Sequence, residues 1–268
     1  MRLRFVFIAL LANVAQSPGL AAPLQPSAKW VVDFGEAHCV AARDYQTLGN
    51  VYSLILQPSP VGDNYEVMIV RKGSGPEFAQ ELDATVAFDG RAIKTFNLSY
   101  GQTKPQMRHF DIYHLSKDEM ERARNASLVT FDTEHSPPIS FTLASMAVLL
   151  DNLATCSEGL KSYWNYDGEK TGVIAKPAKV KLAGIFTDED FPAEALKRHQ
   201  EGTGRFLLLI DQAGKVANCN VIKSVGYPIF DAKSCAIIAE RGKFQPALDA
   251  KGKPVRSMFE SQTITYRY

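Results

Sequence analysis

The chain has no excess of charge of either sign and no long apolar run. Its 30 Lys and Arg residues and 29 Asp and Glu residues give a net charge of +1 at pH 7. This balance argues against a nucleic-acid partner, because binding a polyanion requires a basic surface. The apolar stretch near the N-terminus, residues 5–15, is far shorter than the ~20 residues that a membrane-spanning helix needs.

Motifs for catalysis and for metal binding are missing as well. The chain has no Gly-x-Ser-x-Gly, Cys-x-x-Cys or Cys-x-x-His sequence, which argues against a nucleophilic serine, zinc or redox site. Of the five histidines, His109 and His114 stand five apart in a strand-like stretch and would point to opposite faces. His38, His135 and His199 are isolated. We therefore expect no catalytic residue, no metal and no cofactor.

The N-terminus has the pattern of a secretory signal, predicted over residues 1–22. Arg2 and Arg4 supply the positive start, residues 5–15 the apolar stretch, and Ala21 and Ala22 small residues for cleavage. An uncleaved anchor or a buried first helix is the alternative. Cleavage would leave an exported protein that does not span a membrane.

Export makes the four cysteines candidates for disulfides, because exported proteins meet an oxidising environment. Four cysteines permit three pairings. Their positions favour Cys39–Cys156 and Cys219–Cys235. For the second pair, Cys219 shares a strand face with Val221, and Cys235 shares a helix face with Ile238, and these two faces can meet. Buried free thiols are the alternative.

Alternating patterns predict an α+β protein. Strands are expected at residues 30–34, 39–44, 51–57, 65–71, 83–88, 91–98, 107–115, 128–132 and 139–143. Asp89-Gly90 predicts a tight hairpin turn, and Ser116 with Glu119 predicts a capped helix start. Apolar residues recur at helical spacing from Leu143 to Trp164.

These elements predict a mainly antiparallel β domain at residues 23–165, closed by a long helix. A linker at residues 166–183 and a small domain at residues 184–268 follow. Residues 23–165 hold 12 basic and 17 acidic side chains (12 − 17 = −5), and residues 166–268 hold 16 and 12 (16 − 12 = +4). Two solvated surfaces of opposite sign, or docking of the two halves on each other, would explain this asymmetry.

The last 80 or so residues read as an α-β-β-α-β module. Pro192 suits a first helical turn, which predicts a helix over residues 193–200. Residues 206–210 form an apolar run typical of a covered strand, and Gly214 sits in a turn before a strand at 216–224. A helix after Asp231 and a long strand at 255–268 complete the module.

This order of elements resembles the C-terminal domain of the TonB energy-transducer family. The matching positions are Pro192, Glu194, Ala195, Gly202, Asp211, Gly214, Val216, Ser224, Gly226, Asp231, Phe244, Pro246, Gly252 and Val255. The resemblance implies a periplasmic, non-catalytic binding module of the bacterial envelope, linked to outer-membrane transport. In that family the module captures a segment of outer-membrane receptors, the TonB box, beside its last strand.

The pairing positions that the resemblance implies lie in the last strand. They are Ser257, Met258, Phe259, Glu260, Ser261, Gln262, Thr263, Ile264 and Thr265. An exposed strand edge carries free N–H and C=O groups with which a second chain can pair. The partner implied is a protein, such as the N-terminal segment of a receptor.

Three features depart from the family pattern. A cleavable signal stands in place of the membrane anchor, and a globular half in place of the Pro-rich spacer. Asp188-Glu189-Asp190 replaces a segment that helps to contact the receptor. These departures favour capture of a partner without transduction of energy.

The role of the first half stays open. Its layout, with early Trp30 and Cys39, many strands, a Ser-capped helix and a closing helix, resembles the invasion-associated locus B proteins of bacterial envelopes. Besides peptide capture, two other functions stay open: a structural or docking role without TonB-box recognition, and a ligand-binding or enzymatic first half. A fold resemblance alone does not decide between them.

Overall fold

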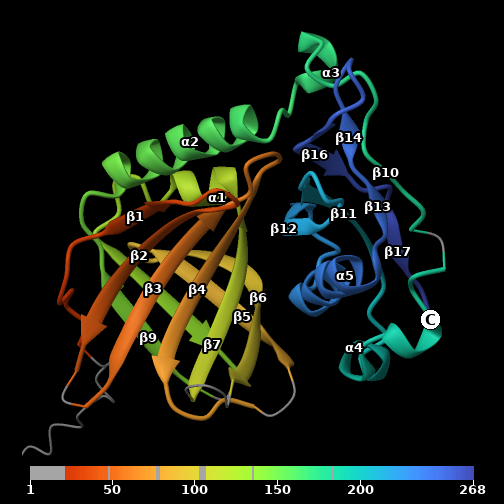
Figure 1. Ribbon diagram of the computed structural model, residues 1–268. Helices are drawn as coiled ribbons and strands as arrows, with labels where there is room; N and C mark the ends of the chain where they lie inside the picture. The colour runs from red at the N-terminus through yellow and green to blue at the C-terminus, as the bar shows by residue number, and fades with distance from the viewer. Residues whose placement is uncertain (1–21, 48, 77–78, 103–106, 135, 183) are drawn as a thin grey trace, which may run out of the picture.

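A computed structural model describes residues 22–47, 49–76, 79–102, 107–134, 136–182 and 184–268. The predicted signal peptide thus lies outside the described residues, except for Ala22. No helix within the described ranges is long and apolar enough to cross a membrane. A large antiparallel sheet fills the first half and a smaller mixed part follows it, which confirms the α+β class (Figure 1).

The first half is built on nine antiparallel strands in the order β1-β2-β3-β4-β7-β6-β5-β8-β9. Their bounds are β1 Val31–Phe34, β2 Cys39–Gln46, β3 Val51–Pro58, β4 Asn64–Lys72, β5 Gln80–Phe88, β6 Arg91–Gln102, β7 Arg108–Ser116, β8 Leu128–Thr133 and β9 Ser136–Thr142. All nine predicted strands are present, although β6 runs four residues beyond the predicted end at Leu98. The predicted turn is confirmed, because Asp89 and Gly90 both have positive φ (45° and 79°).

The segment before β1 closes this sheet into a barrel. Leu24 forms a parallel bridge with Phe141 of β9, and Pro26 forms an antiparallel bridge with Tyr45 of β2. The N–H of Leu24 donates to the carbonyl of Ser140 at 2.8 Å. Strands β9 and β2 are therefore joined through this segment, and β1 continues along the same edge of β2 (Figure 1).

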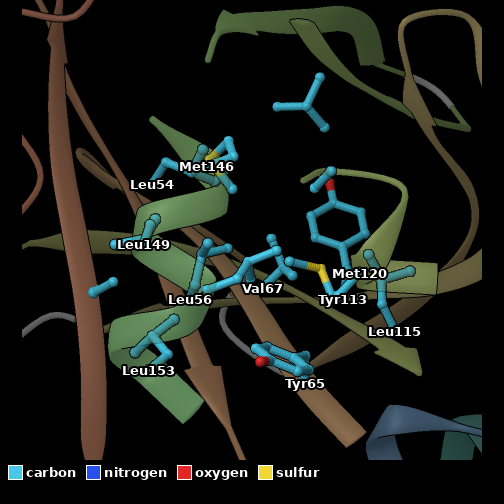
Figure 2. Packing of buried hydrophobic residues seen from close by; sticks show 14 of the residues in the cluster. Leu54, Leu56, Tyr65, Val67, Tyr113, Leu115, Met120, Met146, Leu149 and Leu153 are labelled. Atoms are coloured by element: carbon cyan, nitrogen blue, oxygen red, sulfur yellow. The ribbon is translucent and has the colours of Figure 1, made fainter. Parts of the chain in front are cut away.

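Two helices cover the interior of the barrel. They are α1 (Lys117–Glu121) and α2 (Met146–Tyr163), and Figure 2 shows α2 side chains packed against Leu54, Leu56 and Val67 of the strands. The predicted capping box at α1 is confirmed, since Ser116 and Glu119 each accept the other's backbone N–H.

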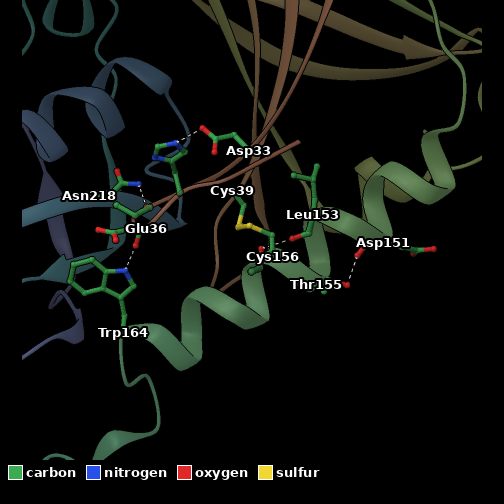
Figure 3. Close-up of a disulfide and its surroundings, with 12 residues drawn as sticks. Asp33, Glu36, Cys39, Asp151, Leu153, Thr155, Cys156, Trp164 and Asn218 are labelled. Carbon is green, nitrogen blue, oxygen red and sulfur yellow. Dashed lines mark hydrogen bonds and ion pairs between the residues drawn. A yellow bond between two sulfur atoms is a disulfide. The ribbon is translucent and has the colours of Figure 1, made fainter. Parts of the chain in front are cut away.

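A disulfide ties α2 to the sheet. Cys156 of α2 is bonded to Cys39 of β2, as predicted (Figure 3). At the end of α2, Trp164 Nε1 donates to the carbonyl of Glu36 at 2.5 Å. The closing helix is thus held to the strands near its middle and at its end.

The C-terminal part forms a second, smaller sheet with one main helix. Its elements are η1 Asp188–Asp190, α4 Ala193–Lys197, β11 Gly202–Ile210, β12 Val216–Lys223, α5 Pro228–Arg241, β13 Phe244–Gln245, β14 Ala247–Leu248, β15 Pro254–Val255, β16 Ser257–Glu260 and β17 Ile264–Tyr266. The central strand β11 pairs with β12 on one side and with β16 and β17 on the other. The second predicted disulfide, Cys219–Cys235, joins β12 to α5.

Two predicted elements are wrong in extent. The helix predicted over residues 193–200 ends at Lys197, because His199 takes a left-handed backbone conformation (φ 53°) that a helix cannot contain. The strand predicted over residues 255–268 is divided into β15, β16 and β17, and β15 pairs with β14 instead of β11.

Residues 166–182, in the predicted linker, pack on the C-terminal part. Here α3 (Gly168–Thr171) is followed by Ile174 and Ala178, which are buried with Ala247. The N–H groups of Ala175 and Lys176 both donate to the carbonyl of Leu248, and β10 (Lys179–Val180) pairs with β13.

The two halves dock through the outer face of the barrel. Helix α5 lies against β5, β6 and β7 (Figure 1), where Leu98 is buried in the core of the C-terminal part. Glu81 of β5 accepts hydrogen bonds from the N–H of Ile229 (3.2 Å) and from Gln200 Nε2 (2.8 Å). Arg198 lies 3.8 Å from the same carboxylate, so opposite charges of the two halves meet at this interface.

A buried ion pair completes this interface. His114 of β7 places Nδ1 3.2 Å from Asp231 of α5 and Nε2 3.6 Å from Glu66 of β4. His109 instead faces the barrel interior, where it contacts Ser99 and Asp111, so the two histidines do point to opposite faces. Burial alone would lower the pKa of His114, but the two carboxylates outweigh it and raise the pKa to about 9.

We expect the protein to lose stability as the pH rises from neutral to about 9. A histidine whose pKa is raised on folding stabilises the fold fully below its unfolded pKa of ~6.5, and this contribution is lost as the pH passes the folded pKa of about 9. The shift corresponds to roughly 3 kcal/mol. Urea unfolding between pH 6.5 and 10 would measure it. His114→Gln should flatten the slope, and an unchanged slope would contradict this assignment.

Candidate functional site

The nine predicted partner-binding residues lie along one side of β11, in two short strands. Ser257 to Glu260 form β16, which pairs with Leu207 to Ile210. Ile264 and Thr265 belong to β17, which pairs with Gly202 to Gly204. Ser261, Gln262 and Thr263 connect the two strands. The predicted residues thus share one edge of the sheet.

An extra residue breaks this edge in the middle. From Leu207 to Gly204 the central strand takes three steps, whereas its partner takes four, from Glu260 to Ile264. At the break Ser261 bonds to Phe206 twice, with its N–H donating to the carbonyl and its Oγ accepting the N–H. This is a bulge, which bends a strand and locally interrupts its ladder.

The other edge of the small sheet, β12, is covered by the first half. Asn218 Nδ2 donates to the carbonyl of Ala37 at 2.6 Å. At Gly62, in the turn between β3 and β4, a Cβ atom would lie 3.0 Å from the carbonyl oxygen of Ile222. The barrel therefore occupies the approach to β12.

The outer side of β16 and β17 borders two hollows. One of about 390 Å³ lies beside β17, with Leu182, Phe186 and Phe191 in its opposite wall. The other, of about 630 Å³, lies beside β16, with Tyr166, Ile174 and Ala178 in its opposite wall. Four predicted residues line the first hollow and four line the second (4 + 4 = 8), so only Ser261 of the nine lines neither.

Aromatic side chains form the floor of the hollow beside β17. The ring of Tyr266 stacks on Phe230 at 4.2 Å and meets Phe191 edge-on at 5.9 Å. Its hydroxyl lies 3.0 Å from Ser234 Oγ, and burial raises the pKa of Tyr266. The rings of Tyr266 and Phe191 give this hollow an apolar surface, which suits a bound apolar side chain.

The acidic run at residues 188–190 is only partly exposed. Asp190 is buried and accepts hydrogen bonds from Arg241 Nη1 (2.7 Å) and Nη2 (3.0 Å). These bonds, with those from Thr187, hold the pKa of Asp190 well below its usual range. Asp188 is exposed and lines the hollow beside β17. Glu189 is exposed as well, so Asp188 and Glu189 are accessible to a partner, whereas Asp190 is not.

Ser99, His109 and Asp111 lie together inside the barrel, an arrangement the sequence did not predict. Ser99 Oγ is 2.7 Å and Asp111 Oδ1 3.2 Å from the same nitrogen, Nε2 of His109. A catalytic triad needs the serine and the carboxylate on different ring nitrogens. Nδ1 of His109 is buried without a hydrogen-bond partner, and Ser99 is itself buried. This cluster is therefore not a nucleophilic relay.

Metal ligands do not gather in the part of the chain that the structure describes. No group of three or more His, Cys, Asp or Glu side chains there could hold a metal ion. All four cysteines are engaged in disulfides.

Comparison with known proteins gives a match for the C-terminal part of the chain. No curated protein and no solved structure matches the chain. A family model does match its C-terminal part, and the domains of this family are non-enzymatic protein-interaction domains of the bacterial envelope. Residues 188–268 match the family described as Gram-negative bacterial TonB protein C-terminal.

Proposed function

We propose that the protein is a non-catalytic, exported envelope protein that binds an extended segment of a partner by strand addition. The observation that carries this proposal is the contrast between the two edges of the small sheet. The barrel covers β12, whereas β16 and β17 border two hollows. Added strands gain affinity from main-chain hydrogen bonds and specificity from pockets for alternate side chains.

The partner class that fits best is the N-terminal segment of an outer-membrane receptor, met in the periplasm. The family match at residues 188–268 supports this class. The packing of α5 on the barrel supports capture of the partner without transduction of energy. It holds the C-terminal module against the first half through Glu81 and His114. The first half would serve as the platform of the module, and its likeness to the invasion-associated locus B proteins stays a prediction.

Proline substitutions at Ile264 and Thr265 test the proposal. Successive N–H groups of an antiparallel strand point to opposite neighbours. One of the two substitutions therefore removes an N–H that points to the open side of β17, where the partner would pair. The other removes an N–H that points to β11. We expect the outward variant to weaken binding of TonB-box peptides about tenfold, which is ~1.4 kcal/mol, in isothermal titration.

The control is Ala250→Pro, in the turn between β14 and β15, where proline suits the second position of the turn. It should leave both binding and stability unchanged. If both edge variants bind peptides as the unmodified protein does, strand addition at this edge is wrong. If the unmodified protein binds none of the peptides, a structural or docking role takes its place.

A further inference from the structure

The wall of the larger hollow comes from a segment that the family match does not include. Residues 165–178 face β16 across a space of about 630 Å³, and the match begins at residue 188. We propose that this hollow is a second half of the binding groove, which takes a continuation of the bound segment carrying a basic side chain. This inference rests on the proposed function and extends it to the chemistry of the partner.

The hollow beside β16 combines apolar side chains with one unpaired polar atom, as a binding subsite does. Phe259 of β16 packs against Ile174 and Ala178, and all three side chains are apolar. Ser257, which lines the hollow, keeps its hydroxyl buried without a hydrogen-bond partner. An orphaned buried hydroxyl costs free energy, and a peptide group laid beside β16 could bond it.

The two hollows lie one after the other along the same side of β11, beside β16 and then β17. A single extended segment of the partner can therefore occupy both hollows. From Ser257 to Thr265 the edge has nine residues, or ~30 Å at ~3.3 Å per residue. The bulge at Ser261 separates the two arms, so a bound segment would pair with β17 and β16 in two short runs.

The far end of the groove is fixed by a side chain. Asn165 Nδ2 donates to the carbonyl of Arg256 at 2.8 Å, directly before β16. Tyr166 also donates its hydroxyl to Glu260 at 3.4 Å. Since the Arg256 carbonyl already has a donor, we expect pairing by the partner to stop at Ser257.

The rim of the hollow is acidic. Asp167, Glu169 and Glu260 line it, against one cation, Lys170. Lys170 Nζ lies 2.9 Å from Asp167, and Glu260 is paired with Arg205. Glu169 has no ion-pair partner within 4 Å among the described residues, so it is the carboxylate best placed to meet a basic side chain of the partner.

Peptides of two lengths test this inference on the full chain. The short peptide is a TonB box, and the long ones add Val-Lys-Val-Lys or Val-Glu-Val-Glu at either end. We expect one Lys extension to bind about tenfold tighter than the short peptide in titration calorimetry, and the matching Glu extension to bind no tighter. In Glu169→Lys this preference should reverse, whereas Glu134→Lys, the same charge change on the barrel, should leave it intact.

The outcomes separate the two proposals. If the short peptide binds and no extension binds tighter, the second subsite is wrong while strand addition beside β17 stands. The same holds if Lys and Glu extensions bind equally. If the short peptide does not bind, both proposals fail.

Discussion

Replacing Cys39 and Cys156 together by serine is expected to lower the free energy of unfolding by about 5 kcal/mol. The two residues lie 117 positions apart, and on the chain-entropy model a long closed loop gives the largest gain from a crosslink. The disulfide also fixes α2 over the barrel core (Figure 3), so its loss frees the helix that covers Leu54 and Leu56. Denaturant unfolding of both proteins would measure the difference.

The second disulfide provides the matched comparison. Cys219 and Cys235 lie 16 positions apart, for which the same model gives about 3 kcal/mol. The Cys39/Cys156 variant should therefore be the less stable of the two double variants. The reverse order would mean that strain or residual unfolded structure, and not loop closure, decides the stability of this protein.

Asp231→Ala is expected to cost about 4 kcal/mol, because it leaves a buried histidine without its nearest carboxylate. Asp231 is almost fully buried and accepts hydrogen bonds from Ser224 Oγ (2.5 Å) and the N–H of Val225 (2.9 Å). His114 from the barrel lies 3.2 Å away. One substitution thus removes bonds within the C-terminal part and the main ion pair between the halves.

A double-mutant cycle separates these contributions. His114→Ala removes the histidine, and Asp231→Ala in that background should cost less than it does alone, by about 1–3 kcal/mol of coupling. The measurement is denaturant unfolding of the unmodified protein, the two single variants and the double variant at pH 7. Strict additivity would mean that the pair does not hold the halves together.

Features that depend on a few neighbouring residues could be predicted from the sequence. The turn at Asp89-Gly90 needs only two residues that tolerate positive φ, and the cap at Ser116 needs only a glutamate three positions on. The pairing of Cys219 with Cys235 followed from two local periodicities. The strands of the barrel followed from alternation.

Features set by distant neighbours could not be predicted. Glu81 meets the N–H of Ile229 across 148 positions, and no local pattern signals that contact. The bulge at Ser261 depends on Phe206 of another strand. Ile174 and Ala178, which border the groove, lay in the predicted linker, because nothing in their local sequence signals their contacts with Ala247.

At the edge of the small sheet, the resemblance to a family predicted which residues lie there but not the shape of the strand. The positions Ser257 to Thr265 lie along one side of β11, but as two arms divided by a bulge and not as one strand. The resemblance also gave no sign of the wall built by residues 165–178, which lies outside the matched region.

Backbone amide exchange of β16 and β17, with and without a bound TonB-box peptide, tests strand addition most directly. We expect the outward N–H groups between Ser257 and Tyr266 to become protected when the peptide binds, while those of β12 keep their rates. A peptide that binds and leaves the exchange of β16 and β17 unchanged, or protects β12 or the barrel instead, would contradict the account.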